Sequence, residues 1–432
     1  MTQGATVDAG QPGDDKAPGT VDKATSRKTT RAAFFGFFVD YYDIYLPVVA
    51  LAPAILYFQP ADLPPATKTT LFYLTLIATL LGRPLGSIMF GGLADSMGRR
   101  KSTLIAVAGF TVCTLAMAAL PGYDVLGYWA IGLLILLRFI GGVFMGGEYA
   151  GANPLAMEQA PPARRGFVGA LIGSAYPWGF IAISVATLLM LTSVGDEAYL
   201  QWGWRVPFIL GGVLGIILFF QFARVPESEA WLKAKRENAQ STREGSLRTL
   251  FRGVNGRKLA QVIVVTMGMW WGSAALVSAT PPLLQTFFEL PSQQVIYGLL
   301  VANIALAAGY MVYGITGQRI GRRRALMIAG VLDLVIAVPA FYLMVRAVQS
   351  GESLWLIMTY YTVALVIAMS PFGIASTYII ERFAVGVRAA GYGTGYALAG
   401  VIPSLYAFHM LYLDNVMPYE FTRWSFSFSP GC

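Results

Sequence analysis

Long apolar segments recur along the chain and restrict its fold more than any other feature of the sequence. Each has about 20 residues, the length with which an α-helix crosses a hydrocarbon core of about 30 Å. They lie near 33–58, 70–93, 102–120, 128–151, 166–191 and 204–223, and then near 259–288, 295–316, 325–347, 354–379 and 390–413. The sequence therefore predicts an all-α membrane protein with eleven spanning helices.

The composition agrees with a chain embedded in lipid. Of its 432 residues, 56% are hydrophobic and 12% are charged, whereas about 25% are charged in soluble domains. Of the 31 Lys and Arg residues, we assign all but six to one side of the membrane, as is typical of cytoplasmic segments. We therefore predict a multi-pass protein of the plasma (inner) membrane with a cytoplasmic N-terminus. The net charge of +8 then needs no nucleic-acid partner to explain it.

A basic, polar stretch divides the chain into two halves. The predicted parts are a disordered cytoplasmic N-terminus at 1–32, an N-terminal six-helix half at 33–223, a cytoplasmic linker at 224–258, a C-terminal half of five helices at 259–413 and an atypical tail at 414–432. The tail is too short and too polar to span a bilayer. We therefore expect helix twelve to be missing.

The two halves are related by a single displacement. Gly98, Arg99 and Arg100 recur 223 residues later as Gly321, Arg322 and Arg323, and Glu158 with Arg165 recurs as Glu381 with Arg388. Two loops that share one displacement indicate a duplicated six-helix unit, arranged as a parallel repeat. The second copy has Gln318 in the place of Asp95, so its loop lacks that acid.

A glycine-rich, basic turn joins the second and third apolar segments. Its sequence is Gly91-Gly92-Leu93-Ala94-Asp95-Ser96-Met97-Gly98-Arg99-Arg100-Lys101. This pattern resembles the loop between helices two and three of major facilitator superfamily transporters. The resemblance implies a conformational-switch loop that includes Gly91, Asp95, Gly98, Arg99 and Arg100. We expect Asp95 to serve conformational exchange rather than substrate binding, because an acid there can contact a base or a helix N-terminus in one state only.

Five ionisable residues lie inside the apolar segments of the first half, namely Asp40, Asp43, Arg83, Arg138 and Glu148. A charge at the centre of a spanning helix costs roughly 2.5–3.5 kcal/mol, so these residues must pair with one another or line a wet cavity. Counted from the cytoplasmic helix ends, Asp43, Arg83 and Glu148 fall near the midplane. We expect them to form one functional cluster, with a structural ion-pair network as the alternative.

These residue types suit proton-coupled transport. A carboxylate that is alternately wet and dry can change its proton occupancy with conformation, and the guanidinium fork of Arg binds a carboxylate bidentately. We expect proton coupling by Asp43, Glu148, Arg138 and Asp40, and substrate binding by Arg83, Tyr42, Trp270, Tyr361 and Tyr392. The aromatic residues have a second interpretation, as anchors of helix ends at the membrane interface.

Within the superfamily, the chain resembles the metabolite:proton symporter family, whose members carry organic acids or zwitterions such as proline and betaine. The resemblance rests on Tyr41-Tyr42-Asp43, Arg83-Pro84-Leu85-Gly86, Gly146-Gly147-Glu148, Gly203-Trp204-Arg205-Val206-Pro207-Phe208 and Pro226-Glu227-Ser228. It implies that the helix-1 acid, the helix-2 Arg and the helix-4 Arg and Glu of that family are Asp43, Arg83, Arg138 and Glu148. Asp40-Tyr41-Tyr42 departs from the usual Glu-Trp-Tyr.

Together these features predict a non-enzymatic symporter that couples a small organic acid to protons by alternating access. We expect a monomer in the lipid bilayer, with a small-molecule metabolite as partner, no nucleic acid, no metal and no cofactor besides the coupling proton. One alternative is a sugar or zwitterion carrier whose aromatic residues dominate the pocket. An alternative of another class is a non-transporting membrane receptor or an inactive truncated product.

Overall fold

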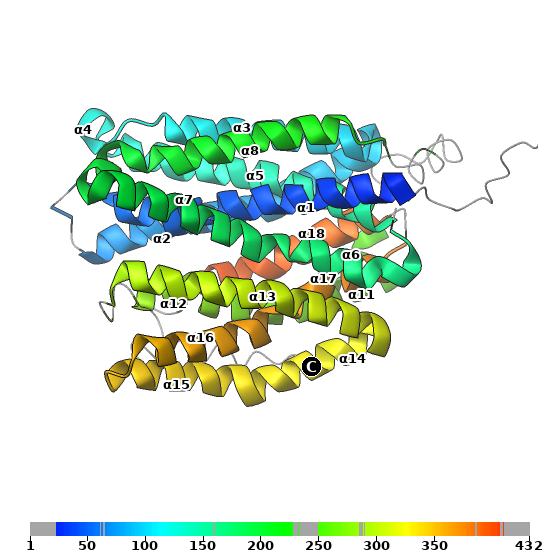
Figure 1. The fold of residues 1–432 in the computed structure, drawn as a ribbon. Helices are drawn as coiled ribbons and strands as arrows, with labels where there is room; N and C mark the ends of the chain where they lie inside the picture. Colours follow the sequence, from blue (N-terminus) through cyan, green and yellow to red (C-terminus); the bar gives the residue numbers. More distant parts are fainter. Residues whose placement is uncertain are drawn as a thin grey trace, which may run out of the picture.

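The computed structural model describes residues 23–227 except 61, 64 and 159, residue 232, and residues 249–406 except 285–287, 289, 385–386, together with residue 409. Over these residues the secondary structure is helical, with no strand. The long helices run side by side between two ends of the molecule (Figure 1). The predicted all-α membrane fold is confirmed.

The first half contains six helical runs. In order they are α1 (Lys23–Tyr45) with its continuations η1 (Leu46–Leu51) and η2 (Ala52–Phe58), α2 (Pro65–Met97), α3 (Arg99–Ala118), the short α4 (Tyr123–Leu126) leading into α5 (Trp129–Glu158), η3 (Pro162–Arg164) with α6 (Arg165–Gly173) and α7 (Ala175–Ala198), and η4 (Tyr199–Gly203) before α8 (Arg205–Ala223).

The second half repeats this plan with more interruptions. Its elements are α11 (Gly253–Ser273) with η5 (Ala274–Ala279) and α12 (Thr280–Pro282), α13 (Ser292–Ile320), α14 (Arg322–Leu332) with η7 (Asp333–Ala337) and α15 (Val338–Gln349), α16 (Leu354–Met369) followed by α17 (Phe372–Arg382), and α18 (Arg388–Ser404). α16 and α17 together form one spanning run that is interrupted near Pro371.

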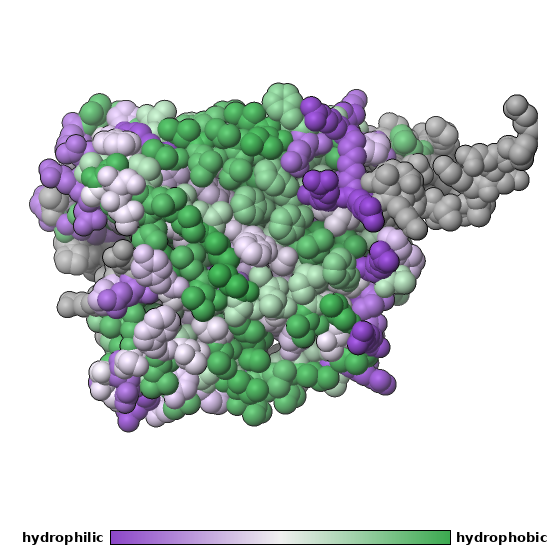
Figure 2. Space-filling view, viewed as in Figure 1, coloured by the Kyte–Doolittle hydropathy of each residue, from purple (hydrophilic) through white to green (hydrophobic). Residues whose placement is uncertain are grey.

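Among the described residues, ten helical runs are long and apolar enough to cross a membrane. α18, with 17 residues, takes the eleventh place and packs against α2 and α11. Leucine, valine, isoleucine and phenylalanine side chains are exposed around the bundle, for example Val112, Leu189 and Phe220. They form a broad apolar band between polar ends (Figure 2), which is the surface that a bilayer requires.

The first helix starts earlier than the sequence predicted. α1 begins at Lys23 rather than near residue 33, so residues 23–32 are helical and not disordered. Thr29, Thr30 and Ala32 are buried, and the Lys28 Nζ donates a hydrogen bond to the Arg224 carbonyl oxygen at 2.6 Å. This packing against the end of α8 stabilises the extra turns. The predicted N-terminus up to residue 22, most of the predicted linker and the tail from 414 onward lie outside the described residues.

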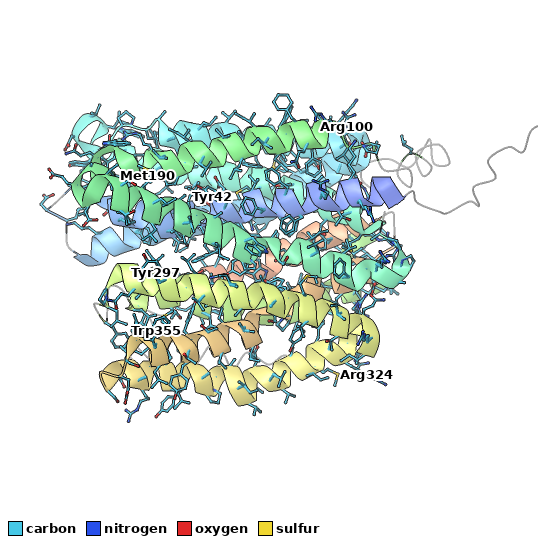
Figure 3. The ribbon with its side chains drawn as sticks, viewed as in Figure 1. Tyr42, Arg100, Met190, Tyr297, Arg324 and Trp355 are labelled. Atoms are coloured by element: carbon cyan, nitrogen blue, oxygen red, sulfur yellow. The ribbon has the colours of Figure 1, made fainter. Side chains whose placement is uncertain are left out.

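The two Gly-Arg-Arg sequences turn the chain in the same way. Gly98 has a φ of 105° between α2 and α3, and Gly321 has a φ of 93° between α13 and α14. Only glycine adopts such angles without strain. Both turns lie at one end of the bundle, where Arg100 and Arg324 also lie (Figure 3), and we call it the basic end. The shared geometry agrees with the predicted repeat.

The opposite end of the first half is held by an aromatic cluster around Arg205. Trp204 is fully buried and its ring packs edge-on against Phe58 and Phe208. The Arg205 guanidinium lies over the Trp204 ring at 4.6 Å and donates hydrogen bonds to the Ala118 and Leu120 carbonyl oxygens at 3.1 and 3.2 Å. Ala118 is the last residue of α3 and Leu120 follows it, so both carbonyls lie where intrahelical donors are lacking. One side chain thus caps α3 and joins it to α8.

Replacement of Arg205 by Lys should lower the free energy of unfolding by about 1–2 kcal/mol. Lysine keeps the charge, but a single ammonium group cannot reach both carbonyls and lie flat on the ring. Thermal unfolding of the purified protein in detergent measures the effect. Arg346→Lys is the matched control, since Arg346 is exposed at the same end of the bundle. Equal stability of the two variants would contradict the capping role.

Candidate functional site

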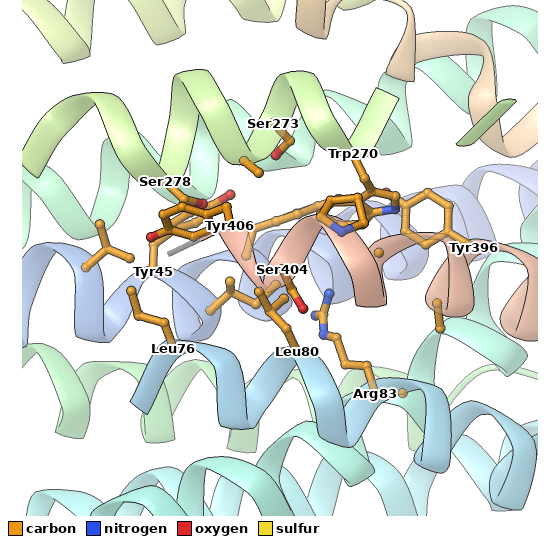
Figure 4. Close-up of a pocket in the computed structure, with 18 of the residues that line it drawn as sticks. Tyr45, Leu76, Leu80, Arg83, Trp270, Ser273, Ser278, Tyr396, Ser404 and Tyr406 are labelled. Carbon is orange, nitrogen blue, oxygen red and sulfur yellow. The ribbon is translucent and has the colours of Figure 1, made fainter. Parts of the chain in front are cut away.

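A central cavity lies between the two halves. Its walls come from α1, α2, α5, α11, η5 and α18, and they are mostly apolar and aromatic. Among the described residues that line it, Arg83 alone carries a charge. Arg83 reaches from α2 toward Trp270 and Ser404 (Figure 4). The cavity is therefore an aromatic chamber with one cationic group at the level of the membrane interior.

Close packing of α2 against α5 places Arg83. A Cβ atom at Gly142 would lie 2.2 Å from the Thr79 carbonyl oxygen, and one at Gly146 would lie 2.2 Å from the Arg83 carbonyl oxygen. Gly82 meets the Phe139 carbonyl oxygen in the same way. These glycines let the two backbones approach, so the Arg83 side chain is directed toward the cavity.

Arg83 is paired with Asp40 of α1. The Arg83 Nη2 donates to the Asp40 Oδ2 at 2.9 Å, and both residues are buried. Asp40 lies one helical turn from Ile44, which lines the cavity. The contact is a charge-assisted hydrogen bond between a guanidinium and a carboxylate. A carboxylate from solvent that entered the cavity would therefore compete with Asp40 for Arg83.

Asp43 and Arg138 form a second ion pair that does not line the cavity. The Arg138 Nη1 donates to the Asp43 Oδ2 at 3.0 Å, and Thr114 donates to the Asp43 Oδ1 at 2.5 Å. The Arg138 Nη2 donates to the Asp43 carbonyl oxygen at 3.0 Å. That carbonyl lacks its usual helical donor because residue 47, four positions on, is Pro47. The pair joins α1, α3 and α5 inside the first half.

Glu148 occupies a third position. It is 1% exposed, and neither of its carboxylate oxygens has a hydrogen-bond partner among the residues that the structure describes. Its Oε1 lies in the space that a side chain at Gly36 of α1 would fill. Its electrostatic neighbours are Asp40 and Arg83. Glu148 is therefore held inside the first half, close to the Arg83 pair but not on the cavity surface.

These positions correct the predicted cluster. The sequence grouped Asp43 with Arg83 and Glu148, whereas the structure pairs Asp43 with Arg138 and groups Asp40 and Glu148 around Arg83. Depth along a helix, which the sequence analysis used, does not determine which neighbouring helix each acid contacts. Asp40 and Asp43 are three residues apart and occupy neighbouring positions on α1, yet their carboxylates contact different helices, through Arg83 of α2 and Arg138 of α5.

Of the four aromatic residues predicted to bind substrate, one lines the cavity and three do not. Trp270 lines the cavity and packs edge-on against Tyr396 (Figure 4). Tyr42 instead donates to the Pro207 carbonyl oxygen at 3.0 Å, and Tyr361 to the Leu276 carbonyl oxygen at 3.1 Å, so both bind neighbouring helices and not the cavity. Tyr392 lies nearer the basic end and is not among the described residues that line the cavity. Lining residues that the sequence analysis did not assign to substrate binding are Tyr41, Tyr45, Ser273, Ser404 and Tyr406.

Three polar side chains connect the halves between the cavity and the basic end. Asn153 of α5 donates from its Nδ2 to the Ser376 Oγ of α17 at 3.0 Å and to the Tyr392 hydroxyl of α18. The Ser376 and Tyr392 hydroxyl groups are 3.1 Å apart. Asn153 and Ser376 are separated by the same 223 residues as the repeated loops. Equivalent positions of the two halves thus meet, and their hydrogen bonds join α5 to α17 and α18.

We expect the contact of Asn153, Ser376 and Tyr392 to limit access to the cavity from the basic end. Loss of the Tyr392 hydroxyl should therefore make the two halves separate there more often. Tyr392→Phe removes a buried hydrogen bond worth about 1 kcal/mol, a shift of about fivefold in population. The measurement is the rate of maleimide labelling of Ala390→Cys, a buried position that contacts Gly91 of α2, in a chain without its native cysteines. Tyr297→Phe, half-exposed at the opposite end, is the control. Unchanged labelling would show that the three side chains do not close the passage.

The predicted switch loop is held by a residue that the sequence analysis did not select as a site. Glu227, just after α8, accepts hydrogen bonds from the backbone N–H groups of Arg99 at 3.1 Å and Arg100 at 3.1 Å. A carboxylate at the first turn of α3 satisfies donors that lack helical partners and complements the helix dipole. Gly91 lies against Ala390 of α18. The side chain of Asp95 lies outside the described residues.

Known transporters resemble the chain in sequence and in fold. The family profile described as "Sugar (and other) transporter" matches residues 28–267. The chain is similar to the proline/betaine transporter of Escherichia coli K12, with 28% identity over 92% of this chain and 80% of that protein. It is similar to the alpha-ketoglutarate permease of the same organism, with 28% identity over 88% and 87%. Among solved structures, the E. coli proton:xylose symporter XylE has a similar fold, with a TM-score of 0.75, 16% identity and 94% coverage of each chain.

Proposed function

The chain belongs to the sugar (and other) transporter family of the major facilitator superfamily, and on that premise we propose that it couples transport of a small organic acid to protons. It is a multi-pass membrane transporter of this superfamily rather than an enzyme. The observation that carries the finer proposal is the Arg83 guanidinium in the cavity wall, held by Asp40 at 2.9 Å.

In this proposal, proton and substrate transport are coupled because Arg83 exchanges the Asp40 carboxylate for the substrate carboxylate. A substrate carboxylate and the Asp40 carboxylate compete for one guanidinium, and two anions beside one cation are costly in a membrane interior. Protonation of Asp40 removes its charge and frees the guanidinium fork for the substrate. Loss of that proton returns Arg83 to Asp40 and releases the substrate. Each transported carboxylate therefore requires a proton on the acid that it displaces.

The hydrogen-bonded contact of Asn153, Ser376 and Tyr392 between the two halves supports alternating access. The halves meet at the basic end through α18 with α2 and α5, and through α6 with α13 and α17. The Gln318 side chain accepts a hydrogen bond from the Gly166 backbone N–H at 2.9 Å across that junction. With the basic end in the cytoplasm, as its Lys and Arg residues favour, this conformation is closed toward the cytoplasm. Separation of these contacts would open the cavity on that side.

A zwitterion carrier is the second candidate. Trp270, Tyr396 and Tyr41 place aromatic rings around the Arg83 and Asp40 pair, and such rings bind a quaternary ammonium group by cation–π attraction. The carboxylate of a betaine would then bind Arg83 while Asp40 stays charged beside the ammonium. The similarity to the proline/betaine transporter also favours this candidate.

Transport by the purified chain in proteoliposomes tests the proposal. The labelled probes are alpha-ketoglutarate, shikimate, proline, betaine and D-xylose, each offered with and without an imposed inward proton gradient. Accumulation of an organic acid that a protonophore abolishes supports the proposal. Accumulation of proline or betaine alone supports the second candidate, and D-xylose alone supports a sugar carrier. Movement of none of the five would favour a non-transporting receptor or an inactive product.

A further inference from the structure

Gly36 of α1 makes room for the carboxylate of Glu148. A Cβ atom at this position would lie 2.2 Å from the Glu148 Oε1, 3.5 Å from its Cδ and 3.6 Å from the Phe222 ring. Real Cβ atoms essentially never lie within 3.0 Å of another atom, so a methyl group at this position would require the end of the Glu148 side chain to shift. Gly36 has no turn or unusual backbone angle to explain it, since it lies in the middle of a regular helix. Its missing side chain is therefore explained by the acid that fills the space.

The same space brings Glu148 close to the Arg83 pair. Gly36 and Asp40 are four residues apart and share one face of α1, about 6 Å from each other along the helix. A carboxylate packed on Gly36 is thus within about one helical turn of Asp40. The charged groups that act on Glu148 are Asp40 from α1 and Arg83 from α2, and the apolar ring of Phe222 from α8 borders the same space beside Gly36. No other charged residue faces it among those that the structure describes.

A charge count over these three residues gives their proton content. Arg83 carries one positive charge, and Asp40 with Glu148 carry two negative charges when both are ionised. A net charge at this depth is costly, so the empty site is neutral when the two acids share one proton. A monocarboxylate bound to Arg83 adds one negative charge, and neutrality then requires the second proton. Binding of one carboxylate is thereby linked to the uptake of one proton.

We propose that Gly36 is a positioning residue for proton coupling, which holds Glu148 beside Asp40 so that the two acids bind one further proton for each carboxylate carried. The inference rests on the proposed function. The proton comes from water on the side to which the cavity is open, adds to a carboxylate oxygen without breaking another bond, and returns to water on the opposite side. Asp43 and Arg138 keep their own pairing and contribute no proton in this scheme.

Gly36→Ala tests the inference in proteoliposomes of the full chain. The methyl group displaces Glu148, so accumulation driven by a proton gradient should fall by about tenfold to a hundredfold, since a displacement of about 1 Å can cost a reacting group about a hundredfold in rate. Counterflow exchange without a gradient should persist, because Arg83 and the cavity are intact. Gly132→Ala, on α5 with open space around its Cβ position, is the matched control and should behave as the unmodified chain.

A size-compensating pair separates positioning from general damage. Glu148→Asp shortens the acid by one methylene group, so the Gly36→Ala/Glu148→Asp double variant should regain accumulation that Gly36→Ala has lost. Gly36→Ala/Glu148→Gln should not regain it. Full accumulation by Gly36→Ala, or no recovery in the double variant, would overturn the inference. If Gly36→Ala does not fold, recovery of both folding and accumulation by Glu148→Asp supports the same contact, and recovery of folding alone overturns the coupling role.

Two further measurements distinguish failure of this inference from failure of the proposed function. Infrared spectra of the purified protein, taken without substrate, should show a protonated carboxyl band that Glu148→Gln removes and Gly36→Ala shifts. A pH-sensitive dye inside the vesicles should report one proton per carboxylate for shikimate, the monocarboxylate probe. If the unmodified chain moves no acid, the proposed function fails, whereas the spectra still test the placement of Glu148. An unchanged band in both variants would overturn the placement itself.

Discussion

Asp40→Asn should abolish accumulation of the substrate against its gradient while exchange down a gradient continues. The asparagine amide has nearly the same shape as the carboxylate, so its oxygen can still accept a hydrogen bond from Arg83. It cannot take up or release a proton, and it no longer competes as an anion for the guanidinium. The accumulation ratio under an inward proton gradient should therefore fall to the equilibrium value of one.

The companion variant at the same pair is Arg83→Lys. Lysine keeps the positive charge and loses the fork, so substrate binding should weaken by about 1–3 kcal/mol while coupling remains. Asp62→Asn is the control, because Asp62 is exposed at the end of the bundle opposite to the basic loops. If Asp40→Asn still accumulates substrate, Asp40 is not the acid that exchanges with it. If Arg83→Lys binds as well as the unmodified chain, the guanidinium is not the anion site.

The fold could be predicted from the sequence because its main signals, the apolar segments and the repeated turns, depend only on positions along the chain. The lengths of the apolar segments indicate how often the chain crosses the membrane. The two Gly-Arg-Arg sequences are separated by 223 residues, and in the structure Gly98 and Gly321 both have a positive φ angle. Because a charged side chain is costly in lipid, the sequence alone identified five candidate site residues, namely Asp40, Asp43, Arg83, Arg138 and Glu148. All five are buried in the first half.

Partner choice among those residues could not be predicted. It depends on the rotation of α1 about its axis, which depth along the chain does not fix. The signal for the Asp43 and Arg138 pair was present but indirect, because Pro47 deprives the Asp43 carbonyl of its helical donor and a nearby Arg can replace it. Tyr361 and Tyr42 show the same limit, since residue type does not say whether a hydroxyl points to a cavity or to a neighbouring backbone.

Arg138→Met should destabilise the protein by about 3–5 kcal/mol, the cost of leaving one member of a buried ion pair alone. Arg138 is 1% exposed and donates to the Asp43 carboxylate and to the carbonyl oxygens of Asp43 and Ile44. Its removal leaves the buried Asp43 carboxylate with the Thr114 hydroxyl but without its cation, and the Asp43 carbonyl oxygen without the Arg138 donor, where α1, α3 and α5 meet. The measurement is the free energy of unfolding of the purified protein, with Arg346→Met as the exposed control.

The double variant Arg138→Met/Asp43→Asn decides what the pair is for. If the pair stabilises the first half, removal of both charges should recover most of the lost stability, because no uncompensated charge remains. Transport by the recovered protein then separates the two interpretations of Asp43. Proton-driven accumulation in the double variant would assign coupling to Asp40 and Glu148 alone. Exchange without accumulation would return Asp43 and Arg138 to the coupling machinery, since a folded protein with an intact Arg83 site would have lost only its response to protons.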